Sequence, residues 1–131
     1  MSTDERIRLE SARVECGFSP EILTVSSGSW IKNAERTGDE TARVGSCWKD
    51  YWQIFTLQDF PTKCPFCGKN LEVGDVDGCH IKVDYKRECL ESRGWMEKTY
   101  IVPGHHGCNI TLDKACQASI NISVVEAREK D

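Results

Sequence analysis

Apolar residues recur with a helical period in one segment of the chain and with a strand period in others. In SCWKDYWQIFTLQDFP they are spaced i, i+3, i+4 and i+7, which predicts an amphipathic helix over residues 46–60 that ends before Pro61. Four aromatic side chains share its apolar face: Trp48, Tyr51, Trp52 and Phe55. We expect this stripe to belong to the core; the alternative is an aromatic surface that binds a partner.

Other segments alternate apolar and polar residues, as a half-buried strand does. GCHIKVD, residues 78–84, and TYIVP, residues 99–103, predict the two strands of a hairpin joined by the charged loop 85–98. The tail INISVVEAREK, residues 120–130, alternates in the same way and predicts a closing strand.

Helix ends are marked at two further places. Ser2 and Glu5 have the spacing of a capping box for a first helix that ends at Gly17. Asn109 opens the segment NITLDKACQAS, where its side chain can cap exposed backbone N–H groups. We therefore predict a helix at each end of the chain, the second one starting at Asn109.

Length and composition are those of one globular domain. The chain has 131 residues, 39% of them hydrophobic, which is enough for a modest core. We divide it into a mostly helical extension over 1–61 and a second module over 62–131, packed as one compact unit. No stretch approaches the roughly 18 apolar residues of a membrane span, so we expect a cytoplasmic protein that does not contact the membrane.

The charge balance weighs against nucleic acid as a partner. Lys and Arg number 17 against 21 Asp and Glu, which gives a net charge of −4 that is spread over both halves of the chain. A nucleic-acid binder usually carries a basic face or stripe, and the sequence predicts none. An acidic surface of this kind suits a protein partner better than DNA.

The chain has eight cysteines, and the spacing of some of them indicates a metal site. CPFCG, residues 64–68, is a Cys-x-x-Cys followed by glycine, as in a knuckle whose two thiolates converge on one ion while the glycine relieves the turn. A redox Cys-x-x-Cys would open a helix, whereas here the following GKNLEVGDVDG is rich in turn residues. We therefore predict metal binding by Cys64 and Cys67.

A structural zinc ion takes four ligands, and PGHHGCN, residues 103–109, supplies the second pair. His105 and Cys108 repeat the x-x separation of the knuckle. His106 is the alternative ligand, although it lies one residue too close to Cys108 for that geometry. The expected site is a closed set of three cysteines and one histidine.

Knuckle, strand, loop, strand, ligand turn and helix follow one another in the order of a treble-clef zinc finger. The predicted fold class is therefore α+β, with a zinc knuckle, a β-hairpin and a helix forming the finger and the N-terminal helical extension packed on it. Of the remaining cysteines, Cys79 and Cys89 could join His80 in a second zinc site, but their irregular spacing disfavours it.

Residues 62–118 resemble the HNH, or ββα-metal, endonuclease family and its small bacterial and phage relatives. The resemblance is carried by the CxxC knuckle, the GCHI strand in the place of DHI or AHI, YIVP, and the ligand-x-x-Cys pair with Asn directly after it. It implies a structural Zn²⁺ and a catalytic Mg²⁺ or Mn²⁺ that acts on DNA. His80 matches the general base of the family, and Asn109 matches the ligand that the helix contributes to the catalytic metal.

Two positions depart from the family pattern. Cys79 stands where many members have an acidic ligand, and a thiolate is too soft to favour Mg²⁺. The asparagine that orients the histidine ring in the family falls near Thr99 or Tyr100. Asp75 or Asp77 is a candidate for the missing carboxylate. Outside the resemblance, His80 fits equally a half-buried strand histidine, and Asn109 a simple helix cap.

Three functions therefore compete. The first is a metal-dependent DNA endonuclease with a partly degraded centre. The second is a catalytically inactive HNH-like zinc module of phage or mobile-element origin that binds or inhibits a protein. The third, a zinc protein that binds nucleic acid without cutting it, lacks the basic stripe that would support it.

Overall fold

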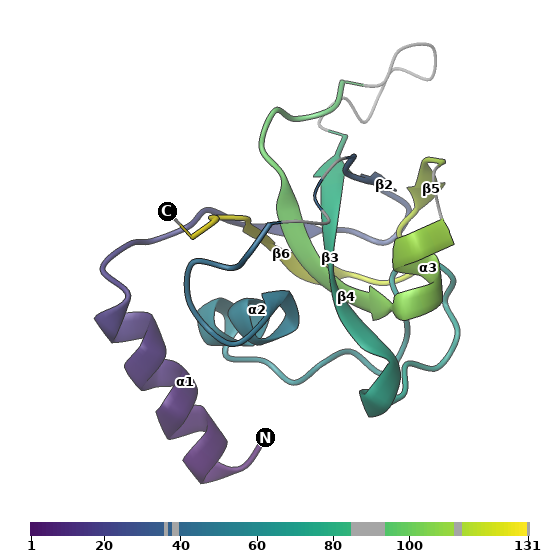
Figure 1. Cartoon of the computed structure of the whole chain (residues 1–131). Coiled ribbons are helices and arrows are strands. Elements are labelled where there is room, and N and C mark those ends of the chain that lie inside the picture. Colours follow the sequence, from purple (N-terminus) through teal and green to yellow (C-terminus); the bar gives the residue numbers. More distant parts are fainter. Residues whose placement is uncertain (36, 38–39, 85–93, 112–113, 131) are drawn as a thin grey trace.

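The computed structural model describes residues 1–35, 37, 40–84, 94–111 and 114–130, and it has an α+β fold built on one curled antiparallel sheet (Figure 1). Its six strands lie in the order β1-β6-β4-β3-β2-β5. The strands are β1 (Ile22–Val25), β2 (Trp30–Asn33), β3 (Val76–Val83), β4 (Tyr100–His105), β5 (Cys116–Gln117) and β6 (Ile122–Glu126). The helices are α1 (Thr3–Glu15), α2 (Trp48–Thr56) and α3 (His106–Thr111), with a single 3₁₀ turn η1 (Val73–Asp75) before β3.

The hairpin predicted from alternation is confirmed as β3 and β4. Their register is continuous, with Asp77 opposite Gly104 and His80 opposite Ile101. Part of the predicted connecting loop, residues 85–93, lies outside the described residues, and so does Cys89. The regular register means that successive side chains of β3 point to opposite faces of the sheet, which decides the position of the site residues below.

Strands β1 and β2 come from the first third of the chain, where the sequence pattern predicted mainly helix. β1 pairs with β6 and β2 pairs with β3, so both are held by partners far away in the sequence. Each has only four residues, too few for alternation to stand out from the background. The sheet is thus built from both ends of the chain.

Helix α2 confirms the aromatic stripe as core. Tyr51, Trp52 and Phe55 are buried, and Trp48 packs against the same cluster. The Tyr51 hydroxyl donates a 2.6 Å hydrogen bond to the Glu126 carbonyl oxygen on β6. The alternative prediction, that these side chains form an exposed surface for a partner, is therefore wrong.

The same helix is shorter than predicted and lies very close to the sheet. It ends at Thr56 because Leu57 takes the left-handed conformation, with φ of 53°, and not because of Pro61. Its first turn passes directly over Gly78 of β3, where a Cβ atom would lie 2.4 Å from the Lys49 nitrogen. Glycine at this position is what allows the close approach.

Helix α1 begins with the predicted capping box and ends at Glu15, two residues before Gly17. The Ser2 hydroxyl accepts a hydrogen bond from the Glu5 N–H, and the Glu5 carboxylate accepts one from the Ser2 N–H. Leu9 is the buried residue of this helix, which packs beside α2 at the end of the molecule away from α3 (Figure 1). No helix in the described part of the chain has the length and apolar character needed to cross a bilayer.

The C-terminal prediction is partly wrong. The helix starts at His106, three residues before Asn109, and is described as far as Thr111; residues 112–113 lie outside the described part. Cys116 and Gln117, expected in the helix, form β5 and pair with β2 instead. Pairing with a distant strand overrides the local helical preference here. The last strand is confirmed as β6, but it lies inside the sheet, between β1 and β4.

Candidate metal centre

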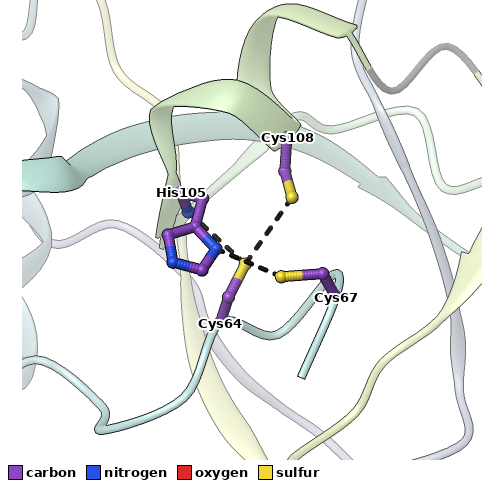
Figure 2. Close-up of side chains that lie close together, drawn as sticks. All are labelled: Cys64, Cys67, His105 and Cys108. Carbon is purple, nitrogen blue, oxygen red and sulfur yellow. Dashed lines mark hydrogen bonds between the residues drawn. The ribbon is translucent and has the colours of Figure 1, made fainter. Parts of the chain in front are cut away.

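Four side chains predicted as metal ligands converge where the knuckle meets the junction of β4 and α3 (Figure 2). Cys64, Cys67, His105 and Cys108 each offer one ligand atom, and these atoms all lie within 4.8 Å of one another. The Sγ atoms of Cys64 and Cys108 are 4.0 Å apart, and Cys67 Sγ is 3.1 Å from His105 Nδ1. None of the three cysteines is in a disulfide.

The knuckle has the tight turn that its sequence predicts. The Gly68 N–H donates to the Cys64 carbonyl oxygen at 2.9 Å, and the Cys64 N–H donates to the Lys69 carbonyl oxygen at 2.9 Å. Gly68 has φ of +74°, a conformation that side chains other than glycine rarely adopt. The glycine after the second cysteine is therefore needed to bring both thiols to the same side of the turn.

Of the two adjacent histidines, the structure brings His105 to the cysteines. Its Nδ1 faces the thiols, and its Nε2 lies 2.9 Å from the Asn70 carbonyl oxygen in the knuckle. Metal-binding histidines commonly donate their second ring N–H to such a carbonyl, which fixes the tautomer and the ring orientation. His106 turns away, and its Nδ1 lies 2.6 Å from Asp77 Oδ2.

The thiols of the cluster differ in their pKa. Burial acts to raise the pKa of Cys67, but hydrogen bonds from the Lys69 backbone N–H and from His105 outweigh it and lower the pKa to about 7. Burial and the neighbouring Cys64 and Cys67 thiols raise the pKa of Cys108 to about 12. One thiolate therefore forms readily, while a second needs a positive charge beside it.

The residues fit a zinc ion. Three thiols and one imidazole are a usual donor set for structural zinc, and tetrahedral bonds of about 2.3 Å to sulfur place neighbouring sulfurs about 3.8 Å apart. The observed Cys64 to Cys108 separation of 4.0 Å is close to that value. The cluster could hold a Zn²⁺ ion with small movements of the side chains, and such an ion would supply the charge that lets the thiols ionise together.

Helix α3 carries Cys108 and is fastened by two residues outside the knuckle. Asn33 of β2 donates through Nδ2 to the carbonyl oxygens of Cys108 and Asn109, at 3.0 and 3.2 Å. Asp77 of β3 accepts through Oδ2 from His106 Nδ1 and, at 3.0 Å, from Asn109 Nδ2. Both anchors hold the turn that presents His105 and Cys108.

The structure places His80 away from this helix. Its ring is buried, packs edge-on against Trp48 of α2 at 4.6 Å between ring centroids, and lies with Nε2 3.0 Å from a Glu40 carboxylate oxygen. Burial lowers the pKa of His80 to about 4. The ring is therefore neutral at physiological pH, but it is not open to a large substrate.

Asn109 lies inside α3, so the prediction that it caps the helix is wrong. Its side chain bonds to Asp77, which lies three residues before His80 on β3 and therefore points to the opposite face of that strand. The predicted catalytic pair His80 and Asn109 is thus not brought together. Of the two candidate carboxylates, Asp77 meets Asn109, whereas Asp75 lies 3.9 Å from His105 Nε2.

The other positions of the expected catalytic centre have structural roles. Cys79 is fully buried, and burial raises the pKa of its thiol well above the ordinary value. Tyr100, near the expected orienting asparagine, is buried and donates its hydroxyl to the Glu21 carboxylate. Neither side chain is placed to orient the His80 ring.

Sequence reasoning missed Asn33 as an anchor and Glu40 as the neighbour of His80. Neither belongs to a motif, and each lies about 40 or more residues from the group that it contacts. Only the alternation of β3, applied strictly, could have shown that Asp77 and His80 face opposite sides.

No family model, curated protein or solved structure matches the chain. The function therefore has to be argued from the geometry and chemistry of these residues.

Proposed function

We propose that the chain is a zinc-stabilised, HNH-like module of treble-clef type that binds a protein partner and does not hydrolyse DNA through His80. The proposed ion is structural, because four protein ligands leave no open position for a substrate. The resemblance over residues 62–118 and the order of knuckle, β3, β4 and α3 along the chain support the treble-clef part of the proposal.

The observation that carries the proposal is the position of His80. A general base must come within hydrogen-bond reach of the water that it activates, beside the metal that holds the phosphate. His80 is 7% exposed and faces Trp48, whereas Asn109 lies beyond the opposite face of β3. The two cannot act on one phosphate without a change in the packing of α2.

Charge supports a protein as the partner. The net charge of −4 makes approach to the DNA backbone unfavourable, since non-specific DNA affinity comes mainly from Lys and Arg that neutralise phosphates. A partner with a basic surface would be attracted by the same charge. Binding of this kind should weaken as salt concentration rises.

A cluster of three side chains favours a second candidate, a metal-dependent nuclease in which a residue other than His80 is the general base. The Asp77 carboxylate, the Asn109 amide and the His106 imidazole meet next to α3. Carboxylate and amide oxygens suit Mg²⁺ or Mn²⁺, and His106 is exposed to solvent. In this candidate Asp77 and Asn109 hold the ion, and His106 takes the place of His80 as the base.

A plasmid-nicking assay with Mg²⁺, Mn²⁺ or Ni²⁺ separates the two candidates. We expect no nicking by zinc-loaded wild-type protein, and nicking that disappears in His80→Ala would overturn the proposal. Nicking that persists in His80→Ala and disappears in Asp77→Ala would establish the second candidate. The zinc is tested separately: Cys67→Ser should bind one zinc equivalent fewer than wild type and unfold or aggregate.

A further inference from the structure

A row of polar and aromatic side chains crosses one face of the sheet at the end of β3 opposite to the cysteine cluster. Gln117 on β5 lies opposite Trp30 on β2. The N–H of Asp84, directly after β3, donates to the Trp30 carbonyl oxygen at 3.1 Å, and Asp84 pairs on its other side with Trp95. Because residues opposite each other in antiparallel strands share a face, these four side chains form one continuous row.

A cavity of about 360 Å³ lies over this row. It is lined by the turn 26–29, Trp30, Asp84 and Gln117. The segment after β5 holds the turn in place: the Gly28 N–H donates to the Ala118 carbonyl oxygen, and the Ala118 N–H donates to the Ser29 carbonyl oxygen, both at 2.7 Å. A preformed cavity of this size, with an aromatic ring and a few polar groups, suits a small ligand.

Two lysines occupy the next row on the same face. Lys32 on β2 lies directly opposite Lys82 on β3, where like charges destabilise a sheet. Lys32 Nζ lies 4.7 Å from the centre of the Trp95 ring, and Lys82 Nζ donates to the Glu97 carbonyl oxygen. Neither contact neutralises an ammonium group. An anion bound between the two lysines would therefore remove their repulsion.

The lysines and the cavity are separated by one step of the strand repeat. Lys32 follows Trp30 by two residues and Lys82 precedes Asp84 by two, a span of about 6.6 Å along each strand. A nucleotide presents a flat base and a phosphate on either side of one sugar, which is a separation of the same order. An indole ring stacks on any base, and Lys is a common phosphate ligand.

We propose that this face binds a nucleotide, with its base in the cavity beside Trp30 and its phosphate at Lys32 and Lys82. The buried Asp84 accepts a hydrogen bond from the Gly94 N–H at 3.2 Å, and a carboxylate has room to accept further ones from a base. Guanine presents two adjacent N–H groups, so we expect it to be preferred.

The charge around the lysines suits one phosphate better than a long strand. Asp84 places a negative charge beside the two positive ones, and the whole chain carries a net charge of −4. A free nucleotide and the terminal nucleotide of a single strand share the required chemistry. The inference goes beyond the proposed function and does not depend on the protein partner or on the zinc ion.

The experiment titrates GMP and guanosine into the zinc-loaded full chain and follows the indole N–H signals by NMR. We expect one GMP per chain, and binding of guanosine, which lacks the phosphate, that is weaker by about tenfold or more. Lys32→Gln and Lys82→Gln should weaken GMP binding by a similar factor and leave guanosine binding unchanged. Lys63→Gln, which changes an exposed lysine in the knuckle, is the matched control and should behave like wild type.

Two further ligands test the base and the source of the nucleotide. Inosine monophosphate lacks the amino group of guanine and should bind several-fold more weakly than GMP; equal affinity would overturn the contact with Asp84. A single-stranded tetranucleotide with a 5′-phosphorylated guanine end should bind at least as tightly as GMP if the ligand is a strand end, and more weakly if it is a free nucleotide.

Three results would overturn the proposal. The first is the absence of saturable binding of both GMP and the tetranucleotide to wild type. The second is equal affinity of wild type for GMP and guanosine, a comparison that holds even where a lysine variant does not fold. The third is unchanged GMP binding in both folded lysine variants.

Discussion

Two neighbouring titratable residues, the buried His80 and the partly buried Glu40, respond to pH in opposite directions. The pKa of His80 is lowered to about 4, so the unfolded chain binds more protons there below about pH 6.5, and acid destabilises the fold. The pKa of Glu40 is raised to about 7, so the folded chain binds more protons between about pH 4.5 and 7, and acid stabilises the fold. The two effects largely cancel between about pH 4.5 and 6.5.

Replacing Glu40 by Gln should remove this cancellation. We expect the free energy of unfolding of Glu40→Gln to fall more steeply than that of wild type as pH drops from about 6.5 to 4.5. The difference in slope should approach about 1.4 kcal/mol per pH unit, the value for one proton. Urea unfolding at a series of pH values measures it, and parallel wild-type and variant curves would show that Glu40 binds protons equally in the folded and unfolded chain.

Helix α3 is too short to be stable alone, and contacts with two strands hold it in place. Its described part, His106–Thr111, has six residues, and isolated helices shorter than about 12 residues are marginal in water. Asn33 from β2 and Asp77 from β3 hold its backbone and side chains, so its position depends on two strands. Because the helix carries Cys108, the same contacts should determine how tightly the cluster binds metal.

Asp77→Ala should weaken zinc binding by about 10- to 100-fold, the usual effect of losing a group that orients metal ligands. Asp77→Asn should lose less, since its amide oxygen can accept the same hydrogen bonds from His106 and Asn109. Competition with a chromogenic chelator measures the dissociation constants. Asp59→Ala, which changes an exposed carboxylate that pairs with the N-terminus, should behave like wild type. Equal affinity in all four proteins would exclude the anchoring role of Asp77.

The whole molecule is organised around a sheet whose strands interleave the two ends of the chain. β1 and β2, from the first third, lie beside β6 and β3, and α2 covers the sheet with its buried aromatic residues (Figure 1). The N-terminal segment therefore contributes side chains to the core that residues 62–131 share, and it also supplies Asn33, which anchors α3.

A fragment of residues 62–131 should consequently fail to fold even with zinc. It would lose both neighbouring strands and α2, and so expose Ile101, Val124 and other fully buried side chains to water. The measurement is amide chemical-shift dispersion in NMR spectra of the fragment with zinc, and co-expression of residues 1–61 should restore it. A dispersed spectrum of the fragment alone would show instead that residues 62–131 form an independent domain.

The sequence by itself determined the parts of this protein that depend on near neighbours. The spacing of CPFCG and of His105 and Cys108 predicted the metal cluster, alternation predicted β3 and β4, and Ser2 with Glu5 predicted the start of α1. Each of these predictions comes from a pattern within a few positions of the chain, although the two ligand pairs then meet across 44 residues between Cys64 and Cys108.

The tertiary structure alone decided which side chains meet across the chain. His105 faces the cysteines, whereas His106 faces Asp77. Cys116 pairs with β2, where a helix was expected. His80 and Asn109 lie on opposite sides of β3. These outcomes depend on strand register and on packing between distant segments, where a shift of one residue reverses the face of every side chain. Periodicity within one segment separates the two faces of a strand, but it does not show which distant segment packs on each face.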